Sequence, residues 1–417
     1  MKLILKYSFI LCLIISQGVL YSQTNSSYSR IGIGDLVYSF SAPELGFDQI
    51  AASVSSTNYI GLTNPATWFR LDMTRFQAGL AYGGLYLSDN TTKDFYGKAQ
   101  FGGFAFAFPV SQEHGIAVAM GLVPYSGINY KVSQNNINTS SSIDEYNLLY
   151  EGSGGLSRAF VGSSYQMPFG LGIGASFNYY FGNLQYSSTA QFQNTNDITT
   201  KYETTYQPTG LGGDFGLISP NIAKLFKSNS ISDLRAAVAF NYIAPLNTDT
   251  LLISSSAIRT DTIAFSTVKM KIPMRISAGL SVVFSDKYIV SLDLASQAWS
   301  DYSFNNVKQS DLRNSLYLSA GFEFRPKQEL GSSNWQQTIW RAGFNYQQTQ
   351  YKVNGVGINQ FGISAGFSYP LSFANTVDFG IEAGIRGETQ SNLIQEKFIK
   401  MNVGLSIGEL WFLRSER

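Results

Sequence analysis

The chain has 417 residues, a formal net charge of +1, 39 glycines, 30 phenylalanines and 25 tyrosines. Charged residues make up 14% of it, against about 25% in a typical soluble protein. The mean hydropathy of −0.03 is too low for a bundle of transmembrane helices. The near-zero net charge disfavours a nucleic-acid partner, which would require a basic excess.

The first 22 residues have the pattern of a secretory signal peptide. Lys2 and Lys6 precede an apolar stretch over 9–20, and small or polar residues follow from Ser22. Cys12, the only cysteine, lies inside this stretch, so cleavage would leave a mature chain without disulfides or cysteine metal sites. A retained anchor helix is the alternative, but the stretch is short. The exported remainder fits either a β-sandwich array or a transmembrane β-barrel.

Period-two alternation runs from about residue 75 to the C-terminus. Phe104, Phe106 and Phe108 alternate with Ala105 and Ala107, and the same pattern recurs over 116–122, 316–325 and 340–346. One face is large and apolar, and the other is mostly small, with occasional charges. A sandwich would carry a charged outer face, whereas lipid outside and a crowded lumen inside explain this asymmetry. The sequence therefore predicts an all-β, antiparallel transmembrane barrel over 74–417.

Fourteen strands are expected, an even number as in bacterial single-chain barrels. Their ranges are 75–88, 95–109, 114–133, 142–166, 170–193, 199–218, 232–253, 264–285, 287–301, 313–326, 335–351, 357–370, 375–388 and 395–412. Mostly short turns alternate with longer loops rich in Asn, Ser and Thr. The short turns are expected on the periplasmic side.

Residues 23–73 precede the first strand and lack clean alternation. Asn64, Pro65 and Ala66 can open a helical turn, with Asn64 as its N-cap. The aromatic and aliphatic content of the segment favours burial, so we expect a hatch that folds into the lumen. The alternative is a free periplasmic tail.

Catalytic signals are weak. The single histidine, His114, is expected in a solvated turn and cannot supply a multi-histidine metal site. No enzyme activity, cofactor or metal is predicted. The charges on the small-residue faces are expected to pair inside the barrel and to anchor the hatch, in preference to forming a catalytic carboxylate pair. They are Asp214, Arg275, Asp293, Glu323, Arg341, Glu382 and Arg386.

The sequence resembles the long-chain fatty acid transporter (FadL-like) family of outer-membrane proteins, in the form common in Bacteroidota. The resemblance rests on the Asn64-Pro65-Ala66 motif before the first strand and on 152–160 with 170–180. It also rests on 286–302, which ends in Trp-Ser-Asp-Tyr, and on the closing stretch 404–412. It implies a monomeric barrel, plugged by its N-terminal segment, that releases hydrophobic molecules sideways at a kink in strand three.

Pro124 and Gly127 mark such a kink in this chain, since proline removes a ladder donor. We therefore expect an outer-membrane channel that admits small hydrophobic, fatty-acid-like compounds by a lateral route. The alternative is an accessory or plug barrel of a larger outer-membrane complex, such as a secretion machine. Outer-membrane lipid and a hydrophobic small molecule are the expected partners, a larger protein complex is a possible third, and no nucleic acid is expected.

Overall fold

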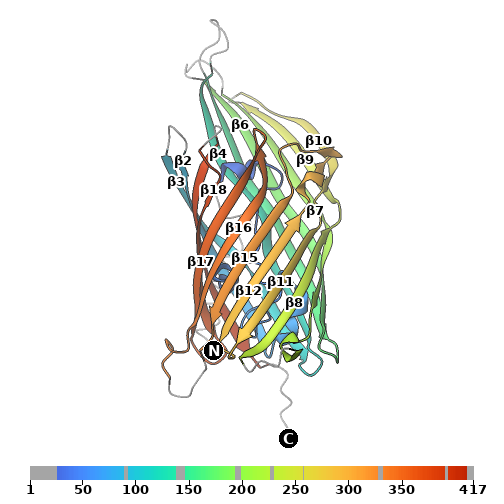
Figure 1. The fold of residues 1–417 in the computed structure, drawn as a ribbon. Helices are drawn as coiled ribbons and strands as arrows, with labels where there is room; N and C mark the ends of the chain where they lie inside the picture. Colours follow the sequence, from blue (N-terminus) through green and yellow to red (C-terminus); the bar gives the residue numbers. More distant parts are fainter. Residues whose placement is uncertain are drawn as a thin grey trace, which may run out of the picture.

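The protein forms a closed β-barrel whose strands tilt steeply against its axis (Figure 1). The computed structural model describes residues 26–88, 93–137, 146–192, 199–225, 230–256, 258–326, 332–389 and 393–410. The expected signal peptide, Cys12 included, and the closing residues Trp411 and Phe412 lie outside these ranges.

Twelve uninterrupted strands and two interrupted ones make up the wall. The uninterrupted strands are β2 (Thr74–Ser88), β3 (Lys93–Ser111), β4 (Ile116–Ile137), β5 (Tyr146–Gln166), β6 (Gly172–Phe192), β7 (Thr200–Ile218), β12 (Tyr288–Gln297), β15 (Ser315–Phe324), β16 (Ile339–Val353), β17 (Val356–Pro370), β18 (Thr376–Arg386) and β19 (Gln395–Glu409). Neighbours pair antiparallel, and β19 closes the cylinder on β2 from Gln395 opposite Ser88 to Glu409 opposite Thr74. The predicted fourteen-stranded antiparallel barrel is confirmed.

Each interrupted strand contains a proline at its break. β8 (Ile231–Ile243) and β9 (Leu246–Ser256) both pair with β7 and are separated by Ala244 and Pro245. β10 (Thr260–Lys271) and β11 (Arg275–Phe284) pair with β9 and β8 and are separated around Pro273. Proline has no backbone N–H to give to the ladder, so each strand bends there without leaving the wall.

One expected strand, 287–301, is too long. β12 ends at Gln297, and a short 3-10 helix, η4 (Trp299–Asp301), follows it. The reason is burial: the side chains of Trp299 and Tyr302 pack into an aromatic and aliphatic cluster inside the barrel. A small hairpin, β13 (Ser303–Phe304) and β14 (Val307–Lys308), then pairs with β10.

The two faces of the wall differ as the alternation predicts. Large apolar side chains such as Leu80, Phe177, Leu292 and Ile363 are exposed on the outside. Small residues and buried charges line the inside. An apolar outer surface on a wall closed by its own hydrogen bonds is the arrangement that lipid requires of a β-protein.

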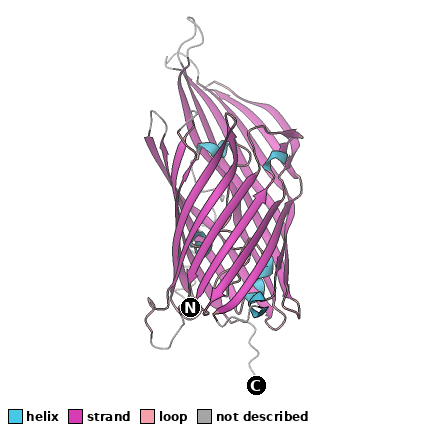
Figure 2. Ribbon diagram, in the orientation of Figure 1, coloured by secondary structure: helices cyan, strands magenta, loops and turns pink. Residues whose placement is uncertain are grey.

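The N-terminal segment, drawn in blue, enters the lumen and contains only short elements (Figures 1 and 2). These are η1 (Ser27–Arg30), β1 (Asp35–Leu36), α2 (Ala42–Gly46) and η2 (Pro65–Arg70), and a further turn, η3 (Ile222–Leu225), follows β7. No helix in the described part of the chain is long and apolar enough to cross a membrane. We refer to residues 26–73 as the hatch.

Candidate functional site in the plugged lumen

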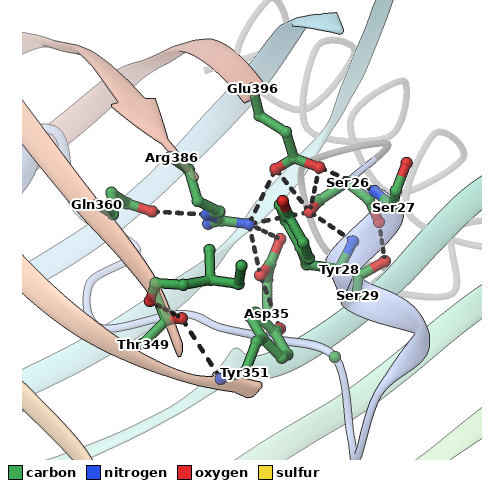
Figure 3. A network of polar contacts seen from close by, with 12 residues as sticks. Ser26, Ser27, Tyr28, Ser29, Asp35, Thr349, Tyr351, Gln360, Arg386 and Glu396 are labelled. Carbon is green, nitrogen blue, oxygen red and sulfur yellow. Dashed lines mark hydrogen bonds and ion pairs between the residues drawn. The ribbon is translucent and has the colours of Figure 1, made fainter. Parts of the chain in front are cut away.

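The start of the hatch is held by one buried arginine, Arg386 of β18 (Figure 3). Its Nη1 donates to Asp35 Oδ1 at 2.9 Å, to Glu396 Oε2 at 3.4 Å and to Ser26 Oγ at 3.0 Å. Ser26 Oγ in turn donates to Glu396, and Tyr351 Oη donates to Asp35 Oδ1 at 2.8 Å. A single guanidinium thus joins hatch and wall, and its removal would leave two carboxylates buried together without their shared cation.

All seven charges that the sequence placed on the small-residue faces are buried. Asp214 pairs with Arg158 at 2.8 Å, and Glu382 pairs with Lys400 at 3.0 Å. Glu323 is shared by Arg341 at 2.5 Å and by Arg325. Of these cations, the sequence reasoning missed Arg158, Lys400 and Arg325, although all three lie in or directly after predicted strands.

Asp293 and Arg275 touch the hatch directly. Asp293 Oδ1 accepts a hydrogen bond of 2.8 Å from the backbone N–H of Ala52. The guanidinium of Arg275 lies over the rings of Tyr38, at 5.4 Å from the centroid, and Tyr125, at 6.0 Å. The hatch therefore meets the wall through charge-assisted and cation–π contacts as well as through apolar packing.

The helix α2 carries a buried carboxyl that the sequence reasoning missed. Ser41 caps the helix by accepting from the backbone N–H of Glu44 at 3.3 Å, and Ser39 Oγ donates to the Glu44 carboxylate at 2.5 Å. Burial raises the pKa of Glu44 to about 7, against the lowering effect of these hydroxyls. The spacing of Ser41 and Glu44, with a proline between them, is a capping signature that could have been read from the sequence.

The Asn64-Pro65-Ala66 motif begins η2 inside the short-turn end of the barrel. Asn64 Oδ1 accepts from the backbone N–H of Ala66 at 2.9 Å, and Asn64 Nδ2 donates to the Ala52 carbonyl at 2.8 Å. A Cβ on Gly216 would lie 1.8 Å from Asn64 Oδ1, and one on Gly174 would lie 2.4 Å from the Ala66 nitrogen. The glycines of β6 and β7 therefore make room for the motif.

The wall opens between β3 and β4. Their pairing runs from Ser111 opposite Ile116 to Phe104 opposite Leu122 and then ends, although both strands continue toward the long-loop end of the barrel. Beyond this point the hatch strand β1 pairs with β4, with Asp35 opposite Gly127 and Leu36 opposite Ser126. A two-residue strand of the hatch thus takes the place beside β4 that β3 has left.

Pro124 and Gly127 lie at this separation. Pro124 follows the last β3 partner, Leu122, by two residues, and the β4–β5 register shifts between Pro124 and Ser126. Gly127 contacts the hatch so closely that a Cβ on Gly34 would lie 2.1 Å from the Gly127 carbonyl oxygen. The structure brings these two predicted gate residues together with β1, while the seven charges are distributed through the lumen.

A cavity of about 700 Å³ lies above the hatch, at the long-loop end. Aromatic and aliphatic side chains line one part of it, polar and charged side chains line the rest, and the hatch residues Ile31 and Gly32 form part of the walls. The apolar side consists of Tyr130, Leu184, Tyr186, Tyr206, Met270, Tyr302 and Phe304, and the charged residues Arg30, Lys308, Asp311 and Lys352 line the polar side. Such a space suits an apolar body with a polar end. In the described part of the chain, no group of acidic, histidine or cysteine side chains could hold a metal ion.

Solved structures with the same architecture are channels of the FadL type. The toluene transporter TodX of Pseudomonas putida matches with a TM-score of 0.60 and 15% identity, covering 91% of this chain and 100% of its own. A FadL homologue of Pseudomonas aeruginosa gives 0.60 and 9%, covering 89% and 98%. The toluene transporter TbuX of Ralstonia pickettii gives 0.58 and 15%, covering 87% and 98%. These likenesses define the fold class, a fourteen-stranded FadL-like barrel.

The sequence itself gives the family. The family model described as BamG matches residues 3–416, so this chain belongs to the BamG family. No curated protein matches the sequence.

Proposed function

We propose that this protein is an outer-membrane channel, not an enzyme, that admits small hydrophobic compounds and releases them sideways between β3 and β4. The observation that carries the proposal is the end of β3–β4 pairing at Phe104 and Leu122, before the middle of either strand counted from the short-turn end. In lipid, unpaired strand edges cost several kcal/mol per group, so a wall that opens there must have a use for the opening. We also propose that the protein has the form of the FadL-like family that is common in Bacteroidota, and that its signal peptide is cleaved.

The cavity above the hatch supplies the entry. Tyr130 belongs to β4, and Gly32 lies three residues before β1, so the cavity and the opening lie beside neighbouring parts of the hatch. A solute could pass from one to the other if β1 moved away from β4. The similar structures are a toluene transporter and a FadL homologue, which agrees with an apolar solute. The uptake assay below uses one aromatic hydrocarbon and one fatty acid, so it distinguishes a preference for either solute.

The proposal is tested by fastening β1 to β4. Leu36 and Ser126 are directly opposed partners, at a separation that suits a disulfide, so Leu36→Cys with Ser126→Cys would cross-link them. Cells expressing the locked protein should take up toluene or laurate at least about tenfold more slowly, and a reductant should restore uptake. Locked protein with normal uptake would exclude the lateral route.

A matched control pair lies on the far wall. Ala342 and Ala365 are opposed partners in β16 and β17, and Ala342 lies nine residues along β16 from Tyr351, which bonds to β1. Ala342→Cys with Ala365→Cys should leave uptake unchanged in both redox states. Loss of uptake in this pair as well would show that any disulfide in the wall disturbs the barrel.

An accessory barrel within a larger outer-membrane complex is the second candidate. The observation that favours it is the filled lumen. Ion pairs and the hatch occupy the space around Arg386 and also the space around Glu323. Purification from the native outer membrane distinguishes the two functions. A protein partner in fixed stoichiometry, together with normal uptake by the locked variant, would establish the accessory function.

A further inference from the structure

A second cavity, of about 270 Å³, lies at the short-turn end of the barrel, away from the proposed route. The hatch contributes Ser53, Val54, Ser55 and Arg70 to its lining. The wall contributes Asp233 and Arg235 of β8, residues of β11 and β12, and Arg325, which directly follows β15. The cavity therefore lies on the seam between hatch and wall, and anything bound in it would touch both.

Its positive charge is only partly balanced. Arg70 and Arg235 share one carboxylate, that of Asp233, at 2.6 and 2.9 Å. Arg325 likewise shares Glu323 with Arg341. The three guanidinium groups of the lining thus depend on two carboxylates, one of which also binds Arg341. The remaining acid in the lining, Asp286, lies exposed in the turn after β11, where water screens it.

The guanidinium groups are close enough to act on one another. The side chain of Arg70 is 43% exposed at the edge of the cavity; its partial burial and the neighbouring positive charges of Arg235 and Arg325 lower its pKa, while Asp233 opposes the change. Such like-charge crowding is unfavourable unless an anion accompanies it.

Three polar atoms in this lining have no hydrogen-bond partner among the described residues. They are the hydroxyls of Ser53 and Ser55 and the Nη2 of Arg325. Ser53 is fully buried, so water in bulk does not reach it. Buried donors of this kind are normally satisfied, and all three belong to residues that line this one cavity.

We propose that this cavity binds a small oxyanion, a carboxylate or a phosphate group, which pins the hatch to the wall from the short-turn end. Arginine forks and serine hydroxyls are the donors that such oxygens prefer. An anion between Ser53, Ser55 and Arg325 would join two hatch residues to a wall residue. The proposal does not depend on the transport function.

The test uses the purified full chain in detergent with inorganic phosphate, acetate and chloride at matched ionic strength. Calorimetry should detect phosphate or acetate binding that chloride does not reproduce, and the oxyanion should raise the thermal midpoint of unfolding. Arg325→Gln should weaken this binding by at least about tenfold, because it removes a charge-assisted donor. Preference for phosphate over acetate, or the reverse, identifies the group.

Two further variants keep the test decisive. Arg259, an exposed arginine paired with Asp261 in another part of the chain, provides the control, and Arg259→Gln should leave binding unchanged. Ser55→Asp places a tethered carboxylate in the cavity and should abolish the response to added anion without lowering the thermal midpoint. Equal responses to phosphate, acetate and chloride, or a normal response in Arg325→Gln, would overturn the proposal.

Discussion

Single buried charges decide how firmly the hatch is held, and most of them hydrogen-bond directly to a partner group. Glu44, like the buried Asp48 and Asp293, forms no ion pair among the described side chains, and its partners are the hydroxyls of Ser39 and Ser41 in the hatch itself. Its pKa of about 7 means that the carboxyl takes up a proton near neutral pH. The hatch should therefore respond to pH.

The sign of this response follows from the direction of the shift. The folded pKa of Glu44 is raised above its ordinary value of 4.5, so the protonated form is favoured in the folded hatch. Its stabilising contribution is full below about pH 4.5 and is lost as the pH rises through about 7, up to about 3 kcal/mol in all. Hydrogen exchange of the α2 amides should accelerate from pH 5 to 8, after correction for intrinsic rates. Glu44→Gln should flatten this dependence, and an equal pH dependence in both proteins would contradict the prediction.

The sequence identified the lumen charges by alternation but could not pair them. Asp214 and Arg158 lie on different strands, and the register of β5, β6 and β7 brings them to 2.8 Å. Register is set by the whole barrel and by turn geometry, so no local pattern predicts it. Arg386 is similar: its partner Asp35 lies 351 positions earlier in the chain.

Among the secondary-structure elements, the two-residue strand β1 has the largest structural effect relative to its length. Gly34, at a φ of 84°, precedes it, and any side chain there would collide with the Gly127 carbonyl. Gly34→Ala should therefore detach β1 from β4 and open the lateral gap. Uptake of a hydrophobic probe should rise several-fold, or protease should cut near residue 34 in the intact barrel.

Gly355 is the matched control for this substitution. Its φ is 81°, but a Cβ there would meet nothing within 4 Å. Gly355→Ala therefore carries the same left-handed strain, about 1 kcal/mol, without the collision. If the two variants behave alike, backbone strain and not the contact with β4 explains the effect.

Strands could be predicted from the sequence far better than the hatch. Lipid outside and crowding inside impose a period of two on every strand, and that period is visible in Phe104, Phe106 and Phe108 and throughout the wall. A two-residue strand such as β1 has no period to detect. Pro124 is the one local sequence feature that indicates the end of β3–β4 pairing. The strand β12 is shorter than expected because Trp299 is buried in a cluster that exists only in the folded lumen.

At the scale of the whole molecule, barrel and hatch are two parts joined by apolar packing and by polar contacts that water could also satisfy. The wall is closed by its own ladder, from β19 to β2, and does not need the hatch for its hydrogen bonds except beside β4. The lumen charges pair largely within the wall, as Glu323 with Arg341 and Glu382 with Lys400. We therefore expect the wall to assemble without residues 26–60.

Deleting residues 26–60 should convert the plugged barrel into an open pore. The deletion removes β1 and α2 and leaves η2, so water would replace the hatch around Arg386, Asp293 and Tyr317. Conductance in planar bilayers should rise at least several-fold over the intact protein, because the filled cross-section becomes aqueous. Heat-modifiable mobility on a gel verifies that the deleted protein still forms a barrel. A folded deletion variant with unchanged conductance would mean that the hatch does not block the lumen.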